Sequence, residues 1–241
     1  MTPSDVLSEI PISESEWHAA RAVVELTAVV AGGISGALHA IRREYDLVGI
    51  TVIGVVSGLG GGIVRDLLLS QGPVLALQQK GLLLTAFLGA GAGMLLGQRT
   101  AHFRAVFWFF EALALGLFTI AGIQRAEEVG LQVIPAIFLG VASGIGGGLL
   151  RDVLCRETPV LLMPGPPYAV SALFGGLTYF GVRLGLDAPT VVCEWLGILA
   201  AFGLRALGTW RRWVMPRHHE VRVRFSRWRA RFPQRRARRR A

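Results

Sequence analysis

Charged residues are scarce in this chain and are concentrated at one end. Asp, Glu, Lys and Arg make up 17% of the 241 residues and hydrophobic residues 52%, whereas an ordinary globular protein carries about 25% charged residues. The mean hydropathy is +0.51. Most of the net charge of +9 comes from the arginine-rich segment 211–240, and the remainder is close to neutral. So little charge leaves too little polar surface for a soluble domain.

Several familiar signals of other protein classes are missing. The two cysteines, Cys155 and Cys193, have neither metal-ligand spacing nor a disulfide framework. The glycine-rich stretch GLGGGIVRD lacks the Gly-Lys-Ser/Thr ending of a phosphate loop. Residues 1–20 are acidic and polar, so we expect no cleavable signal peptide. No nucleophile–base pair stands out, and we expect neither an enzyme nor a bound cofactor.

Long hydrophobic runs are what the sequence does have. A helix needs roughly 20 apolar residues to cross the hydrocarbon of a bilayer. A large soluble helical bundle is the alternative, but runs with almost no amphipathic face leave nothing to meet water. We therefore predict an all-α integral membrane protein with seven transmembrane helices. The runs are 23–41, 47–69, 80–98, 107–124, 131–155, 167–184 and 190–208.

Basic residues in the predicted loops indicate the orientation. An odd number of spans puts the two termini on opposite sides of the membrane. Placing the arginine-rich tail in the cytoplasm puts the acidic N-terminus outside, and it also puts Arg42, Arg43, Arg99, Arg104 and Arg156 inside. We expect a multi-pass protein of the cell inner (plasma) membrane with a cytoplasmic C-terminus.

An internal repeat gives the organisation of the chain. Shifted by 86 residues, the 22-residue segment that starts at Gly54 matches the one that starts at Gly140 at 13 positions without a gap. Each repeat unit holds three predicted spans, which is an odd number. The second unit therefore enters the membrane upside down relative to the first, as in many transporters. We predict a 3+3 inverted repeat plus a seventh helix. The segments are a polar N-terminal segment (1–21), two three-helix repeats (22–98 and 107–184), a seventh helix (190–208) and a basic cytoplasmic tail (209–241).

Both copies contain the pattern S-G-x-G-G-G-x-x-R-D. Three consecutive glycines weaken a helix, so we expect a break or bend that frees backbone carbonyls toward a water-filled path. Close packing between helices is the alternative, because small residues let backbones approach. The candidate pore-lining residues are Gly60, Gly61, Gly62, Gly146, Gly147, Gly148, Ser57 and Ser143.

The motif ends in a charged pair, Arg65-Asp66 in the first copy and Arg151-Asp152 in the second. Charges inside a membrane span are rare and face a cavity or a partner, so we treat these four residues as gating or charge sites. Pairing across the repeats, Arg65 with Asp152 and Arg151 with Asp66, is one arrangement. Anchoring of helix ends near the membrane surface is another. Glu25 and Glu111, which are equivalent in the repeat, are secondary candidates.

The basic tail is interleaved with aromatic residues: Trp213, Phe225, Trp228 and Phe232. Charge alone would let such a segment bind nucleic acid, but beside a membrane helix a polybasic segment more often holds anionic lipid headgroups. We expect it to bind anionic lipid and no specific nucleic acid.

A GGGxxRD motif on the second and fifth of seven spans, in a 3+3+1 organisation, resembles the prokaryotic TRIC (trimeric intracellular cation) channels. The resemblance covers roughly residues 22–208 and includes the Pro-Val-Leu that begins at Pro73 and at Pro159. It implies a homotrimer in which each protomer holds a pore for monovalent cations, chiefly potassium. The pore would run between the repeats along the glycines of spans two and five, with Ser57, Ser143, Asp66 and Asp152 nearby.

Two other functions stay open. A secondary transporter of a small solute such as glycine would use the same inverted repeat, and bacterial relatives of the TRIC family have been described as possible glycine transporters. A structural membrane subunit is the third possibility.

Overall fold

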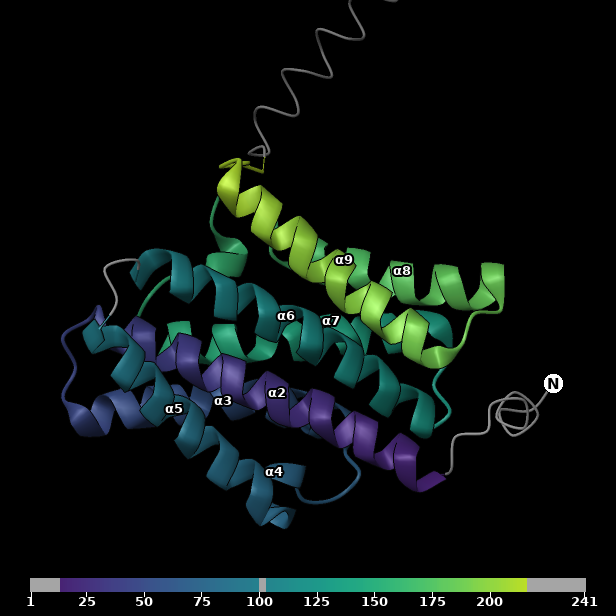
Figure 1. The fold of residues 1–241 in the computed structure, drawn as a ribbon, viewed down its shortest axis with the longest axis horizontal. Helices are drawn as coiled ribbons and strands as arrows, with labels where there is room; N and C mark the ends of the chain where they lie inside the picture. Colours follow the sequence, from purple (N-terminus) through teal and green to yellow (C-terminus); the bar gives the residue numbers. More distant parts are fainter. Residues whose placement is uncertain (1–13, 100–102, 216–241) are drawn as a thin grey trace, which may run out of the picture.

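The computed structural model describes residues 14–99 and 103–215, which form seven long helices (Figure 1). All seven are long and apolar enough to cross a membrane, so the chain is a multi-pass membrane protein. The described residues contain no strand. The long helices are α2 (Glu14–Ile41), α3 (Leu47–Leu69), α5 (Lys80–Arg99), α6 (Phe103–Glu128), α7 (Val133–Leu154), α8 (Ala169–Leu186) and α9 (Thr190–Trp210).

The all-α, seven-span prediction is confirmed, with one extension at the N-terminal side. Helix α2 begins at Glu14, inside the segment expected to be polar and non-membrane, although its membrane-length apolar part begins at Arg21. Glutamate, alanine and arginine are good helix formers, so the helix continues beyond the apolar run. The basic tail beyond Met215 and the N-terminal residues 1–13 lie outside the described residues.

The helices form two equivalent sets of three with opposite directions. In Figure 1, α2 runs from right to left, whereas its equivalent α6 runs from left to right. A short helix follows the second long helix of each set, α4 (Leu75–Gln78) after α3 and the 3₁₀ helix η1 (Val160–Leu162) after α7. Helix α9 has no counterpart in the first set. Below, the N-terminal end of the bundle is where α2 begins, and the C-terminal end is where α9 ends.

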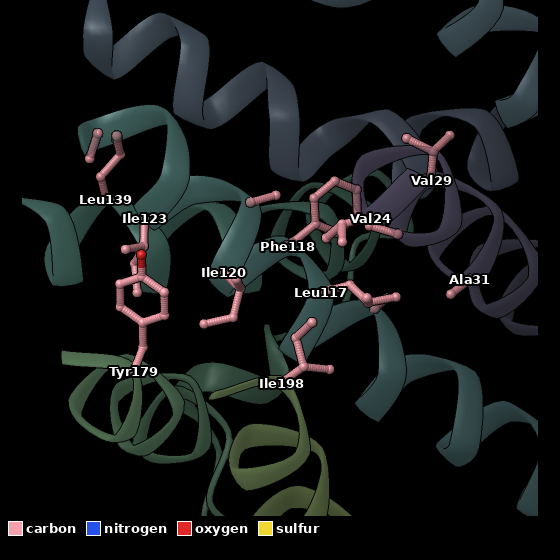
Figure 2. Close-up of a cluster of buried hydrophobic side chains, with 14 of the residues drawn as sticks. Val24, Val29, Ala31, Leu117, Phe118, Ile120, Ile123, Leu139, Tyr179 and Ile198 are labelled. Carbon is pink, nitrogen blue, oxygen red and sulfur yellow. The ribbon is translucent and has the colours of Figure 1, made fainter. Parts of the chain in front are cut away.

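Helix α6 lies at the centre of the bundle and is buried along most of its length. Phe118 lies toward Val29 of α2, and Ile123 lies toward Tyr179 of α8 (Figure 2). Large apolar side chains on the outer helices are exposed instead, such as Phe87 and Leu88 of α5. This distribution fits a protein whose outer surface meets lipid tails.

The triple glycines lie where α3 and α7 cross at close range. A Cβ atom at Gly60 would lie 2.9 Å from Gly147 Cα, and one at Gly61 would lie 2.6 Å from the carbonyl oxygen of Ser143. Both helices run through their triple glycines as uninterrupted α-helix, so the predicted helix breaks are wrong. A backbone group freed inside hydrocarbon has no water to bind, and close packing already uses the lack of side chains.

Candidate functional site

Each repeat holds one buried arginine with two carboxylates. In the first, Arg65 Nη2 lies 2.8 Å from Glu25 Oε1, and Arg65 Nε donates to Asp66 Oδ1 at 2.8 Å. We call these three residues the N-terminal cluster. Arg65 is only 2% exposed, so the attraction to its carboxylates is little screened by water.

The second repeat holds the same arrangement near the opposite end. Arg151 Nη2 lies 2.8 Å from Asp152 Oδ1 and 3.4 Å from Glu111 Oε1, and Arg151 Nε donates to Asp152 Oδ1 at 2.9 Å. Arg151, Asp152 and Glu111 form the C-terminal cluster. Glu25 and Glu111, secondary candidates in the sequence, are therefore direct partners of the arginines.

The second carboxylate oxygen of each aspartate fixes the chain that follows. Asp66 Oδ2 accepts a hydrogen bond from the backbone N–H of Leu75 at 2.8 Å, and Asp152 Oδ2 accepts one from Val160 at 2.9 Å. Leu75 and Val160 begin the short helices α4 and η1. A carboxylate there satisfies a backbone donor that has no partner inside its own helix.

The arginines thus pair within their own repeats, and the pairing across repeats is wrong. The contacts of Gly60 with Gly147 and of Gly61 with Ser143 show that α3 and α7 run antiparallel. Arg65 and Arg151 lie four to five residues beyond this crossing in opposite directions. At 1.5 Å per residue they are roughly 13 Å apart along the helix axes, too far for a side-chain contact with the other repeat's aspartate. Both arginines are buried within the protein, and Arg151 lies in the last turn of α7, so anchoring of the helix ends stays a possible role.

Small residues fill the seam between the two clusters. Ser143 Oγ donates to the carbonyl oxygen of Gly61 at 3.2 Å, and a Cβ atom at Gly147 would meet the carbonyl oxygen of Ser57. The last glycine of each motif differs from the others. A Cβ at Gly62 would have nothing nearer than 3.8 Å, whereas one at Gly148 would meet the Tyr168 hydroxyl.

A cavity of about 370 Å³ reaches the N-terminal cluster from the N-terminal end of the bundle. Arg65 and Glu25 line its deep part, and Glu128 joins Arg21 and Arg125 near its mouth by two ion pairs of 2.6 Å. The lining therefore carries both signs of charge. The remaining lining residues are Ala22, Leu26, Leu75, Gln79, Gly81, Leu82, Ala121 and Gln124.

Phe118 separates the two clusters. It lines a void of about 10 Å³ beside Glu25 and Arg65, and also a second void of about 10 Å³ beside Glu111 and Arg151. Each void is at the lower limit for a single water molecule. Its ring is 2% exposed and closes on Gly61, whose added Cβ would lie 2.9 Å from Phe118 Cγ. Phe118 thus lies between the void next to the wide cavity and the void at the C-terminal cluster.

A second arginine, Arg205 of α9, reaches the C-terminal cluster. Its Nη2 lies 2.8 Å from Glu111 Oε2, and its Nη1 donates to the carbonyl oxygen of Pro166 at 3.1 Å. Its guanidinium carbon also lies 4.5 Å from the ring centre of Tyr168 and 5.2 Å from that of Trp108. Arg205 is not among the predicted site residues, although an arginine inside an apolar span is itself a signal of a functional site.

Tyr168, in the loop before α8, also lies at the C-terminal cluster. Its ring lies against the Arg205 guanidinium, it lines the same void as Glu111 and Arg151, and burial raises the pKa of its hydroxyl. The hydroxyl therefore stays protonated at physiological pH, and Tyr168 acts as a neutral wall.

A third group of polar side chains lies at the C-terminal end. Ligand atoms of His39, Asp152 and Glu157 lie within 4.8 Å of one another, and His39 Nε2 is 3.0 Å from Glu157 Oε1. Arg43 also contacts Glu157, and Arg151 contacts Asp152. Each carboxylate therefore already has a basic partner, and the group is an extension of the ion-pair network.

The second repeat has a further polar network at the N-terminal end. Gln124 Nε2 donates to Glu194 Oε1 at 2.5 Å, and Tyr179 donates to Glu127 Oε2 at 2.7 Å, with Arg183 on the same carboxylate. These residues tie α6, α8 and α9 together. None of them was predicted as a site residue, because they have no counterparts in the repeat.

Comparison with known proteins agrees with this architecture. A family model described as "Glycine transporter" matches the chain twice, over residues 22–98 and 108–184. The TRIC trimeric intracellular cation channel orthologue from Rhodobacter sphaeroides superposes with a TM-score of 0.73 at 30% identity, covering 79% of this chain and 97% of that one. The chain belongs to the prokaryotic TRIC family. A second TRIC cation channel structure gives a TM-score of 0.70 at 31% identity, covering 81% of this chain and 95% of that one.

Further bacterial relatives of this TRIC protein are also membrane proteins. The UPF0126 membrane protein of Deinococcus radiodurans is 38% identical over 63% of this chain and 71% of its own length. The UPF0126 inner membrane protein YadS of Escherichia coli (strain K12) is 31% identical over 74% of this chain and 86% of its own length.

Proposed function

We propose that the chain is a monovalent cation channel, chiefly for potassium, with a pathway inside each protomer between the two repeats. One observation carries this proposal: each end of the α3–α7 seam has two carboxylates, half-buried in the first repeat and buried in the second, and a 370 Å³ cavity reaches the first pair's Glu25 from one side. Carboxylates facing a wet path attract cations. The TRIC relatives named above as cation channels support the same assignment.

In this proposal the pathway runs from the N-terminal cavity past Glu25 and Asp66, through the seam, to Asp152 and Glu111. The seam of Gly60, Gly61, Gly146 and Gly147 with Ser57 and Ser143 would have to widen for an ion to pass, because its backbones are in contact. Gly62 and Gly148 flank the seam beside the two arginines. The described geometry is then that of a closed pathway.

The proposed assembly and membrane location rest on the named relatives and on the basic loops. We propose a homotrimer, because the Rhodobacter sphaeroides relative is named as a trimeric channel. We propose the cell inner membrane, with the N-terminus outside and the C-terminus in the cytoplasm, from the basic loops and from the relative named as an inner membrane protein. Binding of anionic lipid by the basic tail remains part of the proposal.

A secondary transporter of a small zwitterion such as glycine is the second candidate. The matching family model bears that description. The N-terminal cavity is large enough for an amino acid, and its lining offers both guanidinium and carboxylate groups. A transporter would bind its solute there and then open the opposite side.

Reconstitution into planar bilayers and liposomes separates the two candidates. A channel gives stepwise unitary currents that potassium carries and a large organic cation does not. A transporter gives saturable glycine uptake without unitary currents, and that result would overturn the channel proposal. The Glu25→Gln variant serves in both assays, because it removes a charge from the cavity wall while keeping the side-chain shape.

A further inference from the structure

The clusters at the two ends of the seam differ because Arg205 of α9, a helix outside the repeats, joins only the C-terminal cluster. The N-terminal cluster contains two carboxylates and one guanidinium, whereas the C-terminal cluster with Arg205 contains two of each. Glu25 has a single arginine partner among the described residues, but its equivalent Glu111 has two. Among the described residues, the space beside Glu111 and Arg151 is a void of about 10 Å³, whereas the cavity that reaches Glu25 and Arg65 measures about 370 Å³.

Arg205 is held at this level by close packing of α9. A Cβ atom at Gly116 of α6 would lie 2.9 Å from the carbonyl oxygen of Ile198, and one at Gly175 of α8 would lie 2.8 Å from that of Gly197. Such close backbone approach fixes how far α9 can slide along its neighbours. The Arg205 side chain, which is 0% exposed, therefore enters the bundle at the height of Glu111.

The loop that covers the C-terminal cluster is tied to the same helix. Arg205 donates to the carbonyl oxygen of Pro166, and a Cβ atom at Gly208 would lie 2.8 Å from Pro167 Cδ. Just after α9, the backbone N–H of Met215 donates to the carbonyl oxygen of Gly165 at 3.1 Å. The loop and the end of α9 thus form one unit, and movement of α9 would shift the loop and Arg205 together.

We propose that Arg205 is the residue that keeps the C-terminal end of the pathway closed to cations. It is a fixed positive charge on Glu111, wedged between Tyr168 and Trp108, and it must move aside before a cation reaches the void beside Arg151. The proposal rests on the pathway proposed above. Removing the guanidinium leaves the C-terminal cluster with the same charge balance as the N-terminal one and leaves space where the side chain lay.

Thiol accessibility tests this closure without requiring any current. Ser35 of α2 lines the C-terminal void and is buried, so a Ser35→Cys variant reports on that space after Cys155 and Cys193 are replaced by alanine. The protein in lipid nanodiscs is treated with a small, positively charged methanethiosulfonate, and modification is followed by mass spectrometry. Adding Arg205→Gln should raise the rate by at least about tenfold, the factor that corresponds to 1.4 kcal/mol in the opening equilibrium.

Arg183→Gln is the matched control. Arg183 also lies on a helix beside a glutamate and a tyrosine, Glu127 and Tyr179, but belongs to the separate network at the N-terminal end. It should leave the rate unchanged. If Arg205→Gln does not fold, Arg205→Lys keeps the charge but lacks the planar fork that holds Glu111 and Pro166 together, and it should still raise the rate several-fold.

The rate of thiol modification in the Arg205 and Arg183 variants decides whether Arg205 closes this end. A faster reaction in the Arg205 variants alone supports the closure by Arg205. An unchanged rate in a folded Arg205 variant, or an equal increase in the Arg183 control, overturns it. If the wild-type protein carries no current in bilayers, the channel proposal fails, but the thiol measurement still shows whether Arg205 seals this end.

Discussion

The two arginine clusters have the same sequence motif and opposite surroundings. Glu25 is 20% exposed and faces a wide cavity, whereas its equivalent Glu111 is 3% exposed under Arg205 and Tyr168. The same Arg-Asp pair therefore borders water in one repeat and lies in a dry interior in the other. What differs is the seventh helix and the loop it holds, so an element outside the repeat decides how each copy of the motif can act.

Replacing the motif arginine of each cluster by alanine should show the largest difference in stability between the two clusters. Arg151→Ala leaves Asp152 without its arginine and Glu111 with Arg205 alone, and losing one partner of a buried ion pair costs about 3–5 kcal/mol. Arg65→Ala should cost roughly half as much, because Glu25 can recover water from the cavity. Denaturation of the purified variants in one detergent measures the difference. Equal losses would show that the two clusters are equally dry.

Replacing Phe118 tests whether the clusters are separated by its ring. Phe118→Ala would join the two voids and widen the narrowest apolar part of the proposed pathway. We expect a several-fold increase in potassium flux into liposomes, together with lower thermal stability. Leu117→Ala, on the same helix and equally buried but not lining either void, controls for lost packing. If both variants behave alike, Phe118 is an ordinary core residue.

A glycine inside the seam and a glycine beside the N-terminal cluster should respond differently to an added methyl group. Gly147→Ala places a methyl group against the Ser57 carbonyl and should destabilise the protein by about 1–3 kcal/mol. Gly62→Ala has open space beside Arg65, and better helix propensity should stabilise it by up to about 1 kcal/mol. Thermal unfolding of the two variants provides the measurement. A harmless Gly147→Ala would contradict the tight seam.

Replacing Asp66 or Asp152 should show the smallest difference between the two clusters, in unitary potassium conductance. Each aspartate is paired with its neighbouring arginine, but Asp66 borders the void next to the wide cavity, whereas Asp152 lies in a cluster with a second arginine. Asp66→Asn should therefore lower unitary potassium conductance more than Asp152→Asn does. Both variants keep an oxygen that can accept the backbone hydrogen bond of the following short helix. Identical conductances would place neither residue on the ion path.

The sequence predicted the periodic features of the fold and missed those that occur once. Apolar run length predicted seven spans, and the repeat predicted two inverted sets, because both are properties of the chain itself. The fate of the triple glycine could not be predicted, since glycine both weakens a helix and permits close packing. The partners of Arg65 and Arg151 were also missed, because adjacent helical residues point in different directions, yet each arginine contacts its neighbouring aspartate.

Arg205 and Tyr168 show a second limit. Each occurs once, outside the repeated motif, so no internal comparison marks them. Arg205 was visible as a charge within an apolar run, but its target depends on how α9 packs against α6 and α8. Such contacts are set by tertiary structure, and the spacing along the chain says nothing of them.

Helix α9 also bears on how the molecule can change state. In a protein made of two inverted halves, the inward-open and outward-open forms can be reached by exchanging the conformations of the halves, so that each half alternately adopts the shape of the other. Here one half is bound to an additional helix whose arginine occupies its carboxylate, and among the described residues the other half has no such partner for Glu25. The exchange would yield two forms of unequal energy. A protein built this way is better suited to opening one fixed barrier than to cycling between mirror-related forms.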